Sequence, residues 1–202
     1  MIHLPASLAL VLGTTALAQT EAPLAAERTI FSPPTRAFFA TFQVGPAMEI
    51  AGDWGSQLKI GQDFGFHTGG GASGLAIGVS LEESFGNCTE GLGVSCFSFQ
   101  AGPKLWYDVQ LADSLPLYIA PIARVAFAHV NVSAGGVSGS FTGFGLQLGL
   151  ELRAVLADRA VLFFRPVTFD TIVGASDDTL ARIYDDNVAM RYDLTFGGGV
   201  AF

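Results

Sequence analysis

The segment FTGFGLQLGLELRAVL, residues 141–156, alternates apolar and polar side chains with a period of two. Leucines occupy every second position from Leu146 to Leu152, and Gln147, Gly149 and Glu151 stand between them. Successive side chains of a β-strand point to opposite faces, whereas an amphipathic helix repeats about every 3.6 residues. The segment therefore predicts a strand with one apolar and one polar face.

The last thirteen residues repeat this pattern. One face carries Met190, Tyr192, Leu194, Phe196, Val200 and Phe202, and the other carries Arg191, Asp193, Thr195, Gly197, Gly199 and Ala201. Similar segments lie at 37–48, 54–66, 73–83, 96–110, 116–130 and 159–171, which gives eight predicted strands. In 159–171, apolar residues fall on both faces, so its inward face stays open.

Composition narrows the class of protein. Half of the chain is hydrophobic and only 14% is charged, against roughly 25% in an average soluble domain. Outside the first 20 positions the sequence has no apolar run of the length that a membrane-spanning helix needs. The net charge of -8 argues against nucleic-acid binding. We therefore predict an all-β fold, an eight-stranded antiparallel up-and-down transmembrane β-barrel. A soluble exported barrel of the lipocalin type remains an alternative.

The N-terminal segment predicts export. An apolar stretch from Leu4 to Ala18 ends in Ala16-Leu17-Ala18, the small-residue pattern of a signal-peptidase site. We expect a signal peptide over 1–18, a flexible periplasmic lead-in over 19–36 and the barrel domain over 37–202.

The predicted connections differ in length. Leu111–Pro116, Leu156–Ala160 and the Gly69–Gly71 turn are short and should face the periplasm, while 84–95 and 173–187 should form long outer loops. Cys88 and Cys96 lie in and directly after the first of these long loops, and in an exported protein they predict a disulfide.

The polar strand faces predict a charged barrel interior. Alternation assigns six cations and five carboxylates to this face. They are Lys59, Asp63, Glu82, Lys104, Asp108, Arg124, Glu151, Arg153, Arg165, Arg191 and Asp193. An eight-stranded barrel is only wide enough for its own side chains, and unpaired buried charges are costly. We expect an ion-paired plug rather than a permeation path.

Three further groups are weighed as functional sites. His129, Asn131 and Ser133 share one strand face and offer a base and a nucleophile, but no acid that would orient the histidine is evident. His67 is expected to be solvated beside a glycine turn at 69–74 that has no phosphate-binding features. The acidic loop is expected to be solvated without a dedicated metal site; it contains Asp177, Asp178, Asp185 and Asp186, with Asp170 at its base and Arg182 as its cation.

The final strand, with Leu194, Phe196, Val200 and Phe202 on one face, resembles the terminal strand of small eight-stranded bacterial outer-membrane β-barrel proteins. The resemblance implies an outer-membrane location and recognition of Phe202 by the barrel assembly machinery. It also implies contact with outer-membrane lipid and lipopolysaccharide. We expect a monomer without cofactors that has a structural or surface-interaction role and is not an enzyme. The alternatives are a small porin or conduit for apolar solutes and, third, a lipid-modifying enzyme.

Overall fold

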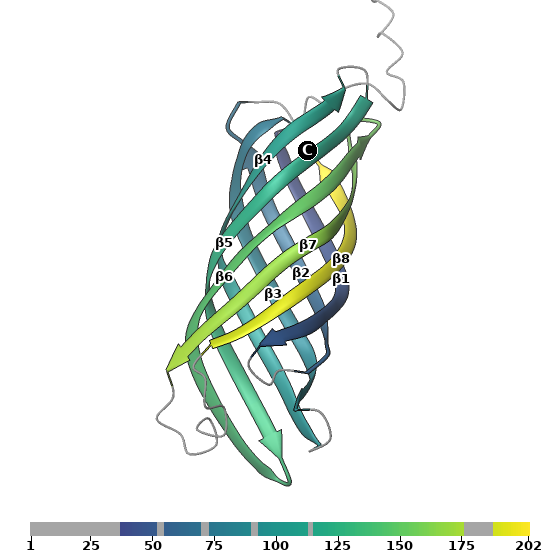
Figure 1. Ribbon diagram of the computed structural model, residues 1–202. Helices are drawn as coiled ribbons and strands as arrows, with labels where there is room; N and C mark the ends of the chain where they lie inside the picture. The colour runs from purple at the N-terminus through teal and green to yellow at the C-terminus, as the bar shows by residue number, and fades with distance from the viewer. Residues whose placement is uncertain (1–36, 52–54, 70–72, 90–92, 113–114, 176–187) are drawn as a thin grey trace, which may run out of the picture.

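The computed structural model describes residues 37–51, 55–69, 73–89, 93–112, 115–175 and 188–202. These residues form eight antiparallel strands in a closed barrel, each paired with its sequence neighbours, with β1 also paired with β8 (Figure 1). The strands are β1 Phe38–Ala51, β2 Gln57–His67, β3 Gly74–Thr89, β4 Val94–Ala112, β5 Leu115–Ala134, β6 Val137–Leu156, β7 Ala160–Ala175 and β8 Val188–Ala201. The predicted fold class is confirmed. The described residues contain no helix long and apolar enough to cross a membrane.

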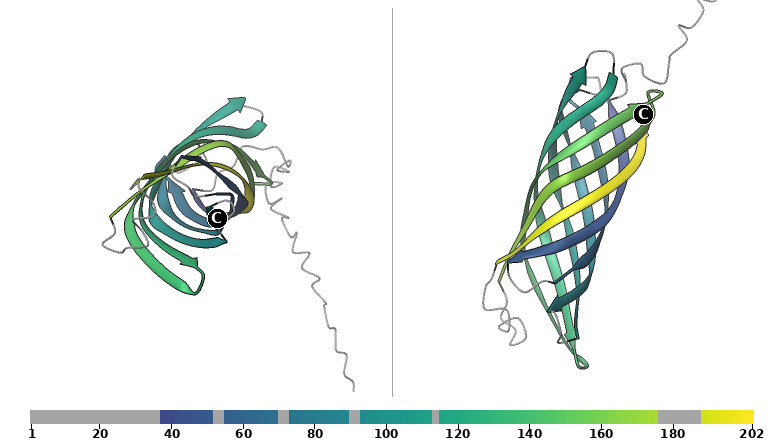
Figure 2. Two further views of the ribbon diagram at one scale, coloured as in Figure 1. Left: turned by 60° about the horizontal axis from the view of Figure 1, so that its bottom comes forward. Right: turned by 45° about the vertical axis from the view of Figure 1, so that its right-hand side comes forward.

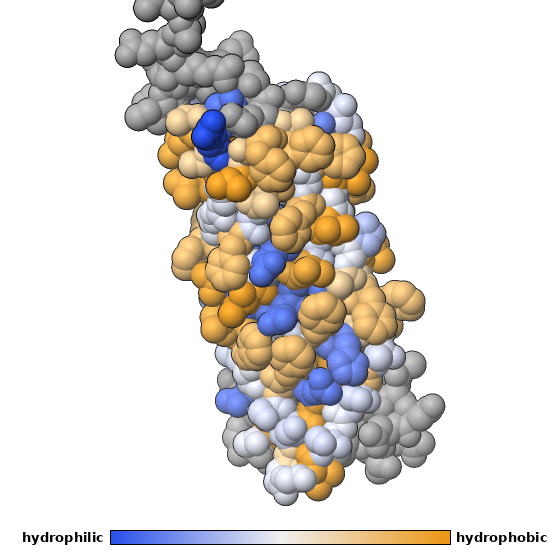
Figure 3. Space-filling model, turned by 180° about the vertical axis from the view of Figure 1, so that it is seen from behind, coloured by the Kyte–Doolittle hydropathy of each residue, from blue (hydrophilic) through white to orange (hydrophobic). Residues whose placement is uncertain are grey.

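Alternation sets the orientation of each strand. On β6, Leu146, Leu148 and Leu152 are 40–52% exposed, whereas Glu151 is fully buried. The apolar side chains therefore face outward and the polar ones inward, which is the reverse of a lipocalin. Seen from behind, hydrophobic side chains cover much of the wall, with paler residues toward the lower end (Figure 3).

The two ends of the barrel differ. The end that carries Phe38, Phe202 and the β6–β7 turn is called here the terminal end, and the opposite end, with the β5–β6 connection, the hairpin end. An oblique view along the barrel shows the ring of strands, and a side view shows their strong tilt (Figure 2). Gly135 and Gly136, with φ of 55° and 85°, make the tight β5–β6 turn, a conformation that favours glycine.

Several strands continue beyond their predicted ends. The long loop predicted over 84–95 is wrong, because β3 runs to Thr89 and β4 begins at Val94. Ser84 and Ser98 pair across these strands, with their hydroxyl oxygens 2.6 Å apart. Polar residues therefore extend the sheet rather than ending it.

A β-bulge determines which residues of β7 face inward, a point that the sequence left undecided. Its pairing with β8 shifts between Arg165 and Thr168, so Arg165 faces inward while Val167 and Phe169 face outward. Pro166 lies within the bulge, where a missing N–H costs no ladder hydrogen bond. Its carbonyl oxygen accepts a hydrogen bond from the Tyr192 hydroxyl.

Candidate functional site

The charged interior predicted from alternation is present. All eleven predicted residues are buried, none more than 4% exposed. Sequence reasoning missed Asp170, which is also fully buried and faces inward rather than marking the base of a solvated loop. With Asp170, the described strands turn six lysines and arginines and six carboxylates inward, and Asp158 of the β6–β7 turn is buried as well. The formal charges that the strands contribute to the interior therefore balance.

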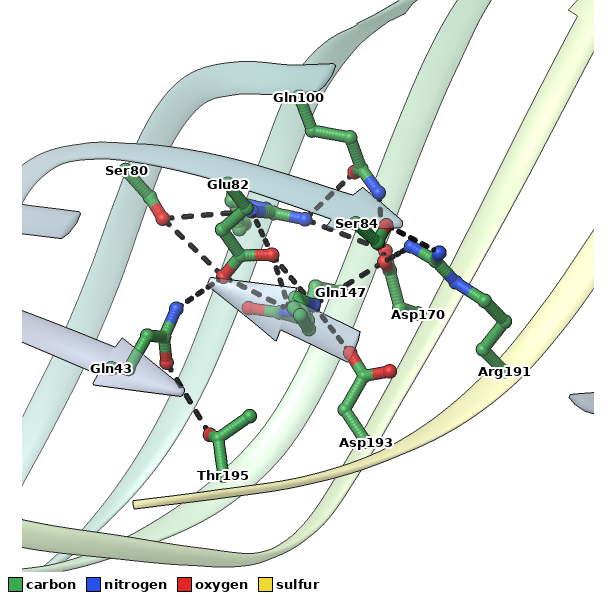
Figure 4. Close-up of polar contacts among 12 residues, drawn as sticks. Gln43, Ser80, Glu82, Ser84, Gln100, Gln147, Asp170, Arg191, Asp193 and Thr195 are labelled. Carbon is green, nitrogen blue, oxygen red and sulfur yellow. Dashed lines mark hydrogen bonds and ion pairs between the residues drawn. The ribbon is translucent and has the colours of Figure 1, made fainter. Parts of the chain in front are cut away.

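The ion pairs form two groups. The hairpin-side cluster comprises Lys59, Glu82, Arg124, Asp170, Arg191 and Asp193, three cations and three carboxylates. Lys59 Nζ lies 2.6 Å from Glu82 and also pairs with Asp193, while Arg124 lies 2.5 Å from Glu82. Asp170 lies 2.6 Å from Arg191 and 3.4 Å from Arg124. Figure 4 shows Glu82 of β3 and Asp170 of β7 converging with Arg191 and Asp193 of β8.

The terminal-side cluster comprises Asp63, Lys104, Asp108, Glu151, Arg153 and Arg165, again three cations and three carboxylates. Arg165 bridges Asp63 at 2.5 Å and Glu151 at 2.7 Å. Arg153 bridges Glu151 at 2.6 Å and Asp108 at 3.0 Å. Each cluster is thus neutral by itself, which satisfies the requirement that buried charges be paired.

Gln43 on β1 links the two clusters. Its side-chain nitrogen donates to Glu82 at 2.8 Å, and its oxygen accepts from Arg165. Thr195 also donates to this oxygen at 3.3 Å, and Figure 4 shows Thr195, Gln43 and Glu82 in sequence. Gln100 similarly joins Arg124 and Asp170, accepting at 2.7 Å and donating at 2.8 Å. The side-chain amides of Gln43 and Gln100 both donate and accept, and Gln43 thereby joins the two ion-pair clusters into one continuous network.

Apolar groups occupy both ends of this network. At the hairpin end, Val130, Val132 and Ile172 belong to a buried cluster that also includes Cys96. At the terminal end, Phe39 packs with Trp106, and Tyr118 with Phe163. The three clusters are completed by Ala76, Ile122, Ala128, Val155, Val161, Ala189 and Ala201. Apolar side chains therefore pack at both ends of the barrel, and at the terminal end they alternate with the ion pairs, since Arg153 lies opposite Tyr118 and Phe163 in the register.

His67 departs from its prediction. It is buried rather than solvated, and its Nε2 lies 2.6 Å from Asp108. Its Nδ1 lies 3.3 Å from the carbonyl oxygen of Ala37. His67 thus extends the terminal-side cluster to the end of the barrel.

The base and nucleophile weighed above lie on the outer wall. His129, Asn131 and Ser133 share the outward face of β5, and the register positions opposite His129 are Phe99 and Thr142. These partners supply no acid beside the histidine, so the geometry does not assemble a triad. No cluster of potential metal ligands occurs among the described residues.

The remaining sequence-predicted sites have mixed outcomes. Cys96 is buried at the hairpin end, but the side chain of Cys88 lies outside the described set, so the disulfide stays a prediction. The acidic loop residues 177–186 and the segments 1–18 and 19–36 also lie outside the described residues. Phe202 is exposed on the outer wall, its ring centroid 6.1 Å from that of Phe38.

Comparison with known proteins identifies the fold but no family. No protein-family model and no curated protein matches this chain. The crystal structure of Neisserial surface protein A is similar, with a TM-score of 0.60 and 15% identity, covering 82% of this chain and 97% of that one. The N-terminal β-barrel domain of Pseudomonas aeruginosa OprF matches with a TM-score of 0.49 and 10% identity, over 85% of this chain and all of that one. A major outer membrane protein from Thermus thermophilus matches with a TM-score of 0.45 and 15% identity, over 81% and 99% of the two chains. The similarity to Neisserial surface protein A shows that the chain has the fold of a small outer-membrane β-barrel.

Proposed function

We propose that the protein is a closed outer-membrane β-barrel without enzymatic activity that acts as a structural or surface-interaction protein. The supporting observation is the interior, where two neutral ion-pair clusters fill the barrel and apolar side chains pack at both of its ends. Conduction requires a continuous path of water, and this packing opposes one. The apolar outer wall matches the lipid-facing band of membrane barrels.

The polar residues exposed at the hairpin end support a surface role. The β5–β6 pair continues to Ala134 and Val137, and Ser133, Ser138 and Ser140 are exposed there. By contrast, the wall nearer the terminal end is lined by leucine and phenylalanine. The polar hairpin would lie outside the lipid, in contact with lipopolysaccharide or an external partner. Insertion of a monomeric barrel by the assembly machinery belongs to the same proposal.

Orientation and location are tested by cysteine labelling in intact cells. With Cys88 and Cys96 replaced by serine, Ser138→Cys places a thiol at the hairpin end and Thr68→Cys places one at the terminal end, both at exposed positions. A membrane-impermeant maleimide should label Ser138→Cys only, and the protein should fractionate with outer-membrane markers. The opposite labelling, or recovery in the soluble fraction, overturns the proposal.

Closure is tested in planar lipid bilayers. The purified barrel should give no steady single-channel current under conditions where a reconstituted porin does. Sustained large currents would favour the small-porin alternative. Uptake of apolar solutes into vesicles carrying the barrel, compared with protein-free vesicles, tests the conduit alternative, and release of fatty acid from lipopolysaccharide tests the enzyme alternative.

A further inference from the structure

An apolar groove opens on the outer wall near the terminal end. It crosses β4 to β7 and has a volume of about 420 Å³. Its outward-facing lining consists of Leu111, Leu117, Leu152, Ala154, Leu162 and Phe164, and the inward-facing Tyr118, Arg153 and Phe163 complete it. This volume falls within the roughly 300–1,000 Å³ typical of small-molecule sites.

The lining contains one small residue, Ala154. The outward row of β6 carries leucine from Leu146 to Leu152, and Ala154 interrupts it before Leu156. Ala154 pairs with Leu117 on one side and Leu162 on the other, so two large side chains flank a small one. The groove thus has apolar walls and an alanine floor, a shape that accepts a hydrocarbon chain.

The turn beside this groove carries a positive charge. Arg159 lies in the connection between β6 and β7, three residues before Leu162, or about 10 Å along an extended strand. It is exposed, and its carbonyl oxygen accepts a hydrogen bond from Ala201 at 2.7 Å, which holds the turn against β8. Of the lysines and arginines that the structure describes, the other six face the barrel interior. Among the described lysines and arginines, Arg159 is therefore the exposed one, and it lies in the turn next to the groove, outside its lining.

We propose that the groove and Arg159 form a binding site for an anionic phospholipid, with an acyl chain over Ala154 and the phosphate at the guanidinium. The proposal rests on the membrane location proposed above, because the groove near the terminal end meets lipid only if the barrel spans a membrane. Arginine pairs well with phosphate, and an apolar groove beside it fits the chain attached to that phosphate.

Native mass spectrometry of the purified barrel in detergent tests the site directly. Phosphatidylglycerol and phosphatidylethanolamine with identical acyl chains serve as probes. We expect preferential retention of one phosphatidylglycerol, and Arg159→Gln should reduce this preference about five-fold, the contribution of one cation near an anionic lipid. Ala154→Leu should reduce retention of both lipids, because it fills the floor of the groove.

Ala123→Leu is the matched control, since Ala123 lies on the same outward face of β5 between Leu105 and Leu148. It should leave lipid retention unchanged. Equal retention of the two lipids by the unaltered protein, or no effect of Arg159→Gln, overturns the proposal. A dimer peak lost in Ala154→Leu would overturn it in favour of a second copy in the groove. The assay uses purified protein in detergent and does not depend on where the protein lies in the cell. A negative result here would therefore count against the lipid site, whereas a negative cell-fractionation result would count against the proposed function.

Discussion

Asp170 pairs with all three cations of the hairpin-side cluster, Lys59, Arg124 and Arg191. Asp170→Asn keeps the side-chain shape but leaves these three cations facing two carboxylates. Removing one partner of a buried ion pair costs roughly 3–5 kcal/mol. We expect a comparable drop in the free energy of unfolding, measured in urea with the barrel folded in lipid vesicles.

Glu83→Gln provides the control for Asp170→Asn. Glu83 is an exposed neighbour of Glu82 on the outer wall, opposite Ile60 and Phe99 in the register. Removing its charge should cost little or increase stability, because a lipid-facing carboxylate is unfavourable. Equal destabilisation by the two variants would contradict the balanced-interior interpretation.

The period of two was sufficient to assign ten charged residues to the interior, because each lies on a strand whose other face is an apolar row. Arg165 was assigned with them, although the alternation of β7 alone left its inward face open. Alternation did not identify Asp170 as an inward-facing residue, for a physical reason. Counting by twos from Arg165 places Asp170 outward, but the bulge at Pro166 reverses the parity of the following residues. His67 escaped because its burial depends on Asp108, which lies 41 positions away in the sequence, on another strand of the closed barrel.

The β6–β7 turn stores backbone strain. Ala157 and Asp158 have φ of 50° and 58°, in the left-handed region, and Arg159 N donates to Leu156 O at 3.0 Å. The left-handed conformation costs a non-glycine residue roughly 1–2 kcal/mol. We expect Ala157→Gly to raise the free energy of unfolding by about 1 kcal/mol, after allowance for the entropy that glycine adds to the unfolded chain.

Ala160→Gly is the counterpart, because Ala160 begins strand β7. There, glycine brings no relief of strain and loses conformational entropy on folding, so stability should fall. If Ala157→Gly and Ala160→Gly destabilise equally, the turn is not strained. Both free energies come from the same urea titration in vesicles.

The hairpin end of β3 and β4 bears the predicted disulfide. Protein taken from cell envelopes without reductant should show no free thiol after denaturation and two after reduction. Cys88→Ser should leave one reactive thiol, which calibrates the assay. Two free thiols in the unreduced protein would remove the disulfide.

Strand ends were harder to predict than strand centres. Alternation identifies a strand where one face is apolar, but near the hairpin end the facing residues include Ser95, Ser133 and Ser138, which are polar on the outside. Backbone pairing continues there without an apolar signal, as Ser95 opposite Ser133 shows. Sequence therefore locates the part of each strand that has an apolar outer face and underestimates the length of most strands beyond it, β2 being an exception.

Closure of the whole barrel depends on close contact between β1 and β8. A Cβ on Gly199 would collide with the carbonyl oxygen of Ala40 and lie 2.6 Å from the Cα of Thr41. We expect Gly199→Ala to weaken this seam, so that the compact band on an unheated gel is lost at a lower temperature. Gly69→Ala is the control, because nothing lies within 4 Å of a Cβ there. Equal thermal midpoints for the two variants would show that the seam adapts without cost.

The long-range character of the ion pairs bears on how the barrel forms. Lys59 and Asp193 are 134 positions apart, and Arg165 and Asp63 are 102 apart, yet each pair is in direct contact. Until the first and last strands meet, these pairs cannot form, and a partly assembled sheet in lipid keeps only the pairs between neighbouring strands, such as Lys59 with Glu82 and Arg165 with Glu151. Intermediates are therefore penalised, and the rate-limiting event should come late, when the ring closes and the paired interior forms in one cooperative step.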